Sequence, residues 1–172
     1  MAQQIPIKKF EIIQSKIFNL QSLQKQLHLW RFQSKKIVFT NGCFDILHYG
    51  HINYLSKAAD SGTVLIVGVN SDSSVKKLNK GNTRPLQDEK SRATILASLS
   101  FVSAAIIFEE ETPYDLIKLI QPDVLVKGGD WKPENIVGYD IVKAKGGEII
   151  SIEFVEGFST TNIENKIRGN KS

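Results

Sequence analysis

The sequence is poor in cysteine, has no long apolar run and lacks an excess of acidic residues, and each absence excludes a class of protein. A single cysteine, Cys43, excludes an internal disulfide and a cysteine-rich zinc module. No stretch approaches the roughly 20 apolar residues of a membrane helix, and the N-terminus lacks the apolar core of a signal peptide. We therefore expect a cytoplasmic protein with no membrane partner.

The composition is that of one folded domain with a preference for anionic ligands. Apolar residues make up 41% and charged residues 23% of the 172 residues, which is typical of a globular protein with a buried core. The net charge is +4 and the sequence pI is about 9.1. This positive balance favours anionic ligands, but it does not distinguish a nucleotide from a nucleic acid.

Strand and helix patterns alternate along the chain from residue 36 onward. Short apolar runs predict strands, and segments with apolar residues three and four apart predict helices. Such alternation predicts an α/β fold, a doubly wound parallel sheet of five strands with helices on both faces. Strands are expected at residues 36–40, 63–69, 101–108, 123–128 and 148–154, and helices at 48–60, 88–100 and 112–121.

The first 34 residues are expected to form a helical segment of their own. Apolar residues from Phe10 to Trp30 predict an amphipathic helical segment that is broken near Asn19. We divide the chain into this N-terminal helical extension, 1–34, and a second domain, 35–172, which has enough elements to close its own core. The apolar face of the extension must fold back on the domain or pack against a second copy, and we expect a homodimer.

The stretch TNGCFDILHYGH, residues 40–51, places small and polar residues at the exit of a predicted strand. Ligands of parallel sheets bind at the carboxyl ends of strands, where the next helix directs its free amide groups. Gly42 lets the backbone approach a ligand, and His48 and His51 share one face of the first helical turn. We expect an anion there, most simply a chain of phosphates.

Other interpretations of this stretch remain open. Both histidines could be surface or capping residues that bind nothing. Cys43, His48 and His51 could form an open zinc site, although no second group of ligands accompanies them. Cys43 could also be a nucleophile with a histidine base or only a packing residue, and Phe44 could belong to the core.

The segment GCFDILHYGH resembles the G-x-F-D-x-x-H-x-G-H signature of the cytidylyltransferase-like nucleotidylyltransferases, a Rossmann-like family related to class I aminoacyl-tRNA synthetases. A second family signature, a Ser-Thr-Thr run that opens a late helix, appears as GFSTTNIENKI at residues 157–167. From about residue 35 to residue 168 the chain is further similar to adenylyltransferases that act on D-glycero-D-manno-heptose 1-phosphate. The segments VGVNSDSSVKKLNKGNTRPL, DEKSRATILASL and PDVLVKGGDW carry this similarity.

This resemblance implies an enzyme that transfers AMP from ATP to the heptose 1-phosphate, with Mg²⁺ on the phosphates, and forms ADP-heptose for lipopolysaccharide core or cell-surface glycans. Glycerol-phosphate cytidylyltransferases typically have Gly-Asp-Asp-Trp where this chain has Gly-Gly-Asp-Trp at 128–131, which favours ATP over CTP. A sugar kinase is often fused to such domains. No part of this sequence resembles one, so we expect a standalone version that acts with a separate kinase.

Two alternative functions are kept. One is a cytidylyltransferase acting on a polyol or glycerol phosphate. The other is a non-catalytic nucleotide or nucleic-acid binding module of the same fold. The aromatic residues do not interleave with a basic stripe, as binders of single strands require, so we expect small-molecule substrates and no nucleic acid.

The resemblance also implies roles for individual residues. The expected catalytic group is His48, His51, Lys76 and Arg92, with the histidines donating to the α- and β-phosphates. The residues expected to contact the nucleotide are Thr40, Asn41, Gly42, Cys43, Phe44, Gly50, His51, Lys127, Gly129, Asp130, Ser159, Thr160 and Thr161. Those expected to contact the acceptor are Asp45, Asn70, Asp72, Lys76 and Lys80. No side chain is assigned as a metal ligand.

Several of these residues also have a purely structural interpretation. Asp45 could brace its loop through backbone amides, and Asn70 and Asp72 could cap a helix. Arg92 could make a structural ion pair, and Trp131 could cover the site without stacking on a nucleotide. The Ser-Thr-Thr run is a typical helix N-cap, although a capped helix start is itself a phosphate site. The basic run Lys76, Lys77, Lys80 and Arg84 could be a solvated surface, but we expect Lys76 or Lys80 to contact phosphate.

Overall fold

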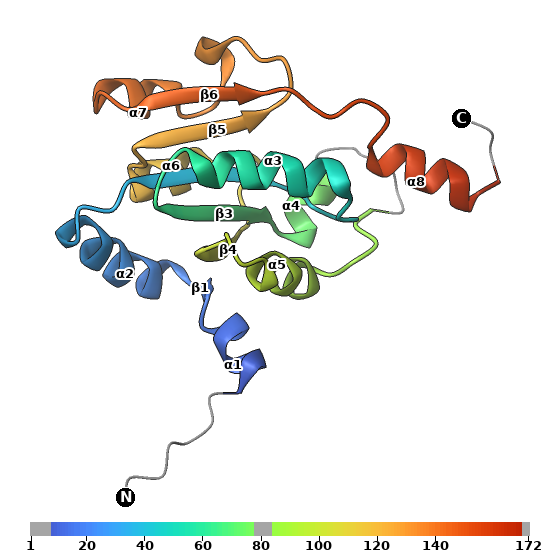
Figure 1. The fold of residues 1–172 in the computed structure, drawn as a ribbon, viewed down its shortest axis with the longest axis horizontal. Helices are drawn as coiled ribbons and strands as arrows, with labels where there is room; N and C mark the ends of the chain where they lie inside the picture. The colour runs from blue at the N-terminus through green and yellow to red at the C-terminus, as the bar shows by residue number, and fades with distance from the viewer. Residues whose placement is uncertain (1–7, 78–83, 170–172) are drawn as a thin grey trace, which may run out of the picture.

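The computed structural model describes residues 8–77 and 84–169, which form a parallel sheet covered by helices on both faces (Figure 1). In spatial order the strands are β1 (Ile17–Phe18), β4 (Ala104–Phe108), β3 (Val64–Asn70), β2 (Ile37–Gly42), β5 (Val124–Gly128) and β6 (Glu148–Ile152), and every neighbouring pair is parallel. The predicted α/β class, Rossmann-like and doubly wound, is therefore confirmed.

The sheet has six strands and not the five that the sequence predicts. The additional strand is β1, in which Ile17 lies opposite Ala105 and Phe18 opposite Ile106 of β4. A strand of two residues is too short to show an alternating pattern of its own, and only its pairing with β4 defines it. The prediction therefore placed these residues in the helical segment.

Alternate side chains of each strand point to opposite faces of the sheet and so build two cores. Ile37 and Phe39 of β2 pack on one face, and Val38 between them packs on the other. The first face is covered by α2 (Leu20–Phe32), α6 (Tyr114–Ile120) and α7 (Tyr139–Ala144), and the second by α3 (Tyr49–Asp60) and α5 (Glu89–Ser98). The remaining helical elements are α1 (Lys9–Gln14), α4 (Asp72–Lys77), the short 3-10 helix η1 (Pro133–Asn135) and α8 (Thr160–Ile167).

The N-terminal segment folds back on its own domain. Helix α2 begins after Asn19, whose side chain accepts a hydrogen bond from the Ser22 amide at 2.8 Å, so the expected break near Asn19 is present. Leu23 and Leu27 of α2 are at most 1% exposed in the core beneath the sheet. Within the described ranges, no helix is both long and apolar enough to cross a membrane.

The strand order reverses between β2 and β5. From β2 the chain moves outward to β3 and β4, and it then returns to the other side of β2 to form β5 and β6. In open α/β sheets, ligands bind in the crevice at the carboxyl ends of the strands next to such a reversal. In Figure 1, α8 lies beyond this end of the sheet, apart from the helices that cover its faces.

Candidate active site

Two adjoining cavities open at the carboxyl ends of β2 and β5. We call the first, of about 370 Å³, the histidine cavity, because His51 lines it together with Arg84 and Thr160. We call the second, of about 440 Å³, the glutamate cavity, because Glu111 lines it. Their shared wall consists of Asn41, Gly42, Cys43, Lys127 and Trp131. The stretch singled out from the sequence therefore separates two compartments and contributes to both.

The rings of His48 and His51 stack at the N-terminus of α3. Their centroids lie 3.9 Å apart with an angle of 25° between the ring planes. Gly50 makes this arrangement possible, because a Cβ there would lie 3.1 Å from the His48 ring. Nδ1 of each ring is buried and has no hydrogen-bond partner among the described residues. Unpartnered buried polar atoms cost stability, so such an atom on His51, which lines the histidine cavity, indicates a functional site. His48 lines neither cavity and reaches this site through its stacking on His51.

Both histidines are neutral at pH 7. Burial lowers the pKa of His48. Burial also lowers the pKa of His51 to about 4, with a further contribution from the nearby His48, and a hydrogen bond to the Ile46 backbone opposes the change only in part. A neutral imidazole carries one N–H group, so a ring can donate a hydrogen bond to an anion when that N–H is not used by a protein acceptor.

The loop between β2 and α3 has an unusual backbone conformation at Phe44, whose φ of 50° lies in the left-handed region. This conformation turns the ring back beneath Gly42, where a Cβ would lie only 2.9 Å from the Phe44 ring. The same ring packs edge-on against His51, with centroids 5.4 Å apart. Phe44 is buried, so it supports the loop and the histidine from below.

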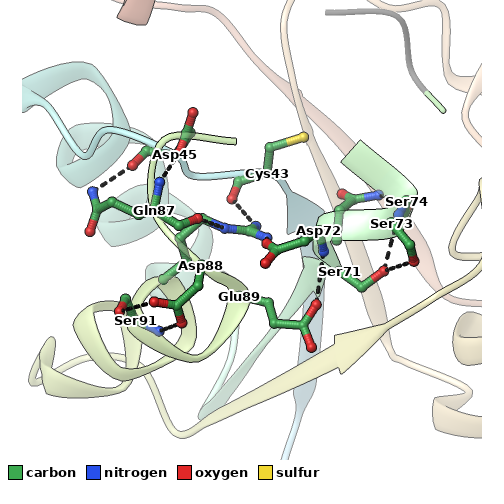
Figure 2. Close-up of polar contacts among 12 residues, drawn as sticks. Cys43, Asp45, Ser71, Asp72, Ser73, Ser74, Gln87, Asp88, Glu89 and Ser91 are labelled. Carbon is green, nitrogen blue, oxygen red and sulfur yellow. Dashed lines mark hydrogen bonds and ion pairs between the residues drawn. The ribbon is translucent and has the colours of Figure 1, made fainter. Parts of the chain in front are cut away.

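Arg92 of α5 holds this loop, and Figure 2 labels two of its partners, Cys43 and Asp72. Its guanidinium donates to the Cys43 carbonyl at 2.6 Å, to the Gln87 carbonyl at 3.0 Å and to the Asp72 carboxylate at 2.7 Å. The residue is 1% exposed and lines neither cavity. The position of Arg92 does not support the predicted catalytic role, and the structural ion pair that the sequence left open is present, with each of the three guanidinium nitrogens donating to a protein acceptor.

Asp45 lines the histidine cavity, but its carboxylate is used to brace the same loop. Its carboxylate accepts hydrogen bonds from the amides of Leu86 and Gln87 at 2.8 to 2.9 Å, while the Gln87 side chain donates to the Asp45 carbonyl at 2.6 Å. The predicted substrate contact is thus replaced by a brace, as Figure 2 shows for Asp45 and Gln87. Sequence reasoning missed Gln87, because its partner lies 42 residues earlier in the chain.

Of three polar residues at and after the end of β3, Asn70 lines a cavity, whereas Ser71 and Asp72 do not. Asn70 lines the glutamate cavity and donates to the Ser74 hydroxyl at 2.9 Å. Asp72 is held by Arg92, its amide donates to the Glu89 carboxylate at 2.8 Å, and it lines neither cavity, so its position does not support the predicted substrate contact. Neither residue caps α4. That role belongs to Ser71, whose hydroxyl accepts from the Ser74 amide at 3.1 Å.

Thr40 belongs to the core and not to the site. Its hydroxyl is fully buried and shares a hydrogen bond with the Tyr54 hydroxyl, which donates in turn to the Val126 carbonyl at 3.2 Å. The Thr40 hydroxyl points toward α3 and is not available to a nucleotide, and the contact expected from this stretch of loop stays a prediction. The bond instead ties β2 to α3 and, through Tyr54, to β5.

The carboxyl end of β5 supplies the other half of the shared wall. Lys127 lines both cavities, and so does Trp131, whose indole N–H donates to the Gly128 carbonyl at 3.1 Å. Gly129 is buried with a φ of 110°, and Asp130 is exposed and lines neither cavity. Phe154, which was not predicted, lines the histidine cavity from the segment after β6.

Helix α8 closes the far side of the histidine cavity. The hydroxyl of Ser159 caps it by accepting from the Asn162 amide at 3.0 Å, and Thr160 lines the cavity while Thr161 is exposed. Arg84 pairs with Glu164 at 2.7 Å, which fastens α8 over the site. The N-termini of α3 and α8 thus both border one compartment.

The basic run after β3 reaches the site through Arg84. Lys76 and Lys77 are exposed and line neither cavity, and Lys80 lies outside the described residues. The phosphate contact predicted for Lys76 is therefore not supported by its position. Arg84 lines the histidine cavity. The sequence holds no local signal for this position, because only the fold brings Arg84 back to the end of β2.

The described side chains do not form a metal-binding site. In the part of the chain that the structure describes, no group of three or more His, Cys, Asp and Glu residues could hold a metal ion. Cys43, His48 and His51 therefore do not form the zinc site that the sequence left open. Asp45, the acidic residue of the histidine cavity, is committed to backbone amides.

Comparisons with known proteins agree with this geometry. A family model described as cytidylyltransferase-like matches residues 39–166. The bifunctional protein HldE of Wolinella succinogenes is 51% identical over 156 residues, which are 91% of this chain and 32% of that protein. HldE of Nitratiruptor sp. is 53% identical over 162 residues, 94% of this chain and 32% of that protein. The chain thus spans about a third of the length of these relatives, and the matches reach into its N-terminal segment.

Solved structures show the same fold. The lipopolysaccharide core biosynthesis protein of Thermoplasma volcanium superposes with a TM-score of 0.57 at 27% identity, covering 70% of this chain and 97% of that one. The pantoate-beta-alanine ligase of Francisella tularensis, complexed with Beta-gamma ATP and Beta-alanine, gives a TM-score of 0.52 at 20% identity. It covers 84% of this chain and 75% of its own, and at that identity it supports the fold alone.

Proposed function

This chain belongs to the cytidylyltransferase-like family and is a nucleotidyltransferase, and we propose that it transfers AMP from ATP to D-glycero-D-manno-heptose 1-phosphate. An oxygen of the acceptor phosphate attacks the α-phosphorus of ATP, the bond from that phosphorus to the β-bridging oxygen breaks, and pyrophosphate leaves with the electron pair. A phosphate monoester is anionic at pH 7, because its second pKa is about 6. The nucleophile therefore needs no strong general base.

The observation that carries this proposal is the stacked, neutral histidine pair beside a basic cavity. Charge moves onto the leaving pyrophosphate in the transition state, and preorganised N–H donors stabilise that charge without having to reorient. His51 lines the histidine cavity together with Arg84 and Lys127, so donors and positive charge converge there. We assign the triphosphate of ATP to this cavity for that reason.

The two helix N-termini at the histidine cavity support the same assignment. Backbone amides at a helix start lack intrahelical partners and, with the helix dipole, favour a phosphate group. α3 begins at Tyr49 beside the histidines, and α8 begins at Thr160 on the opposite wall. Triphosphate between these two ends would receive backbone donors from both sides.

The family implies a nucleoside triphosphate substrate, and we propose that it binds with Mg²⁺. Because the described side chains include no ready group of metal ligands, the ion would be held mainly by the phosphates, whose charge it would reduce. The residues of this chain then have to bind and orient the two phosphorylated substrates.

The choice of acceptor rests on sequence similarity. The chain resembles heptose 1-phosphate adenylyltransferases over residues 35–168, and it is 51 to 53% identical to proteins named HldE. The solved structure from Thermoplasma volcanium belongs to a lipopolysaccharide core biosynthesis protein. These relatives support ADP-heptose as the product, destined for lipopolysaccharide core or a cell-surface glycan.

Release of pyrophosphate, measured with ATP or CTP against a panel of sugar 1-phosphates and glycerol 3-phosphate, tests this function. We expect the heptose 1-phosphate with ATP to give the highest kcat/KM. A preference for CTP with glycerol phosphate would move the chain to the cytidylyltransferases. ATP binding without pyrophosphate release from any acceptor would identify a non-catalytic module. A variant with both His48→Ala and His51→Ala reports the background from contaminating enzymes.

A further inference from the structure

We propose that the glutamate cavity binds the acceptor in one orientation, with its phosphate at Lys127 and the hydroxyl groups of its far end at Glu111. This inference rests on the proposed function, because it names the part of the site that takes the second substrate. The cavity holds about 440 Å³, which is large enough for a sugar phosphate of seven carbons.

The charges of the cavity set this orientation. Among the described residues that line it, Lys127 carries the only positive charge and Glu111 the only negative charge. Lys127 also lines the histidine cavity, whereas Glu111 does not. A phosphate dianion is attracted to Lys127 and repelled by Glu111, so the two ends of the acceptor are distinguished before any close contact is made.

The reaction requires the same orientation. Attack in line with the leaving group brings the acceptor phosphate to within about 3.5 Å of the α-phosphorus. With the triphosphate in the histidine cavity, the acceptor phosphate must lie at the shared wall, beside Asn41, Gly42 and Lys127. The rest of the acceptor then extends away from the histidines toward the loop that follows β4, where Glu111 lies.

The far end of the cavity has the chemistry of a polyol site. A carboxylate has two oxygens that accept hydrogen bonds, and neighbouring hydroxyl groups of a sugar can donate to both. Thr112 and Asn135 add a hydroxyl and an amide to this end. Leu125, Pro113 and Ile136 are buried apolar residues that can pack against the C–H face of a sugar.

A heptose 1-phosphate and a hexose 1-phosphate would therefore be distinguished at Glu111. In D-glycero-D-manno-heptose the additional hydroxymethyl group lies at the end of the molecule opposite the C1 phosphate. Mannose 1-phosphate has the same ring without that group. If the phosphate lies at Lys127, the difference between the two sugars falls at the Glu111 end of the cavity.

The test compares these two acceptors in the wild type, in Glu111→Gln and in Glu109→Gln. Glu109 is an exposed carboxylate two residues before Glu111 that lines neither cavity, so its variant controls for the change of surface charge. We expect Glu111→Gln to raise the KM for the heptose 1-phosphate by about 10- to 100-fold, because charged hydrogen bonds are lost, with the KM for ATP unchanged. The preference for heptose over mannose 1-phosphate should fall by a similar factor.

Binding of the acceptor without ATP provides a second measurement that does not depend on turnover. Trp131 lines the cavity, and the other tryptophan, Trp30, packs on Phe18 and lines neither cavity. In a Trp30→Phe background, the heptose 1-phosphate should change Trp131 fluorescence, with a weaker apparent affinity after Glu111→Gln. The Glu109→Gln variant should titrate like the wild type.

The possible results distinguish a failure of the proposed orientation from a failure of the proposed function. A wild type that releases no pyrophosphate with either acceptor contradicts the proposed function. A wild type that prefers the heptose, together with a Glu111→Gln variant that keeps both its KM and its preference, overturns the orientation alone. A loss of preference confined to Glu111→Gln supports it.

Discussion

The guanidinium of Arg92 lies 2.7 Å from the carboxylate of Asp72 and joins the start of α4 to the loop that separates the two cavities. The arginine side chain is completely buried, while that of Asp72 is 33% exposed. Since the same guanidinium also holds the Cys43 carbonyl, the position of the shared wall depends on this pair. Arg92 thus holds the loop in place and itself lines neither cavity.

Replacement of Arg92 by Met should lower both stability and turnover. It would leave the Cys43 and Gln87 carbonyls and Asp72 without their donor, at a cost of about 3 kcal/mol in the free energy of unfolding. We expect kcat to fall and the affinity for ATP to change little, measured well below the melting temperature. Lys90→Met, an exposed change on the same helix, is the control. A large loss of ATP affinity in a stable variant would make Arg92 a phosphate ligand instead.

The histidine pair should act on the transition state more than on binding. Removal of one preorganised donor typically lowers turnover by about 100- to 1,000-fold, so His48→Ala and His51→Ala should each lower kcat on that scale. Their dissociation constants for ATP should change far less, as isothermal titration can show. His28→Ala removes the remaining histidine, which is exposed, and should leave kcat and the dissociation constant for ATP unchanged. Wild-type turnover in both site variants would contradict the mechanism.

Stability should fall as the pH drops from about 6.5 to 4. The pKa of His51 is lowered to about 4 in the folded protein, whereas the unfolded chain has the ordinary value of 6.5. Between these values the unfolded chain binds a proton that the folded protein does not, so acid favours unfolding by up to about 1.4 kcal/mol per pH unit. Denaturant unfolding at several pH values should show a shallower slope for His51→Asn. An unchanged slope in His51→Asn would contradict burial of a neutral His51.

The N-terminal segment should contribute directly to the stability of the domain. Leu23 is fully buried beneath the sheet, so Leu23→Ala should cost about 2 to 5 kcal/mol in the free energy of unfolding. Leu29 lies on the same helix but is 47% exposed, and Leu29→Ala provides a control with the same chemistry. Equal, small effects of the two changes would show that residues 1–34 are an independent extension.

A homodimer remains a prediction, and the exposed side of the N-terminal segment is where we expect its interface. Phe32 is 88% exposed, and Phe10 and Leu20 are also exposed, so these residues are left for a second copy. Light scattering should give a dimer for the wild type and a monomer for Phe32→Ser. A dimer that persists in the variant would place the interface elsewhere, and a monomeric wild type would contradict the prediction.

Much of the site's location could be predicted because it depends on local sequence. Apolar runs determine where strands form, and β2 lies where its pattern indicates, although it ends at Gly42 and not at Thr40 as predicted. The two histidines lie one helical turn apart at the start of α3. Ser159 caps α8 because its hydroxyl reaches an amide three residues later. Such relationships span a few residues, and the sequence alone determines them.

Contacts between distant segments were decided only by the tertiary structure. The sequence cannot show that Arg92 reaches Cys43 and Asp72, or that Asp45 holds the amides of Leu86 and Gln87, because many pairings satisfy the same donors and acceptors. Packing of the sheet selects one pairing, and with it the division between residues that brace the loop and residues that face the cavities. Glu111 likewise reaches the site only because β4 ends beside β3, which no local pattern encodes.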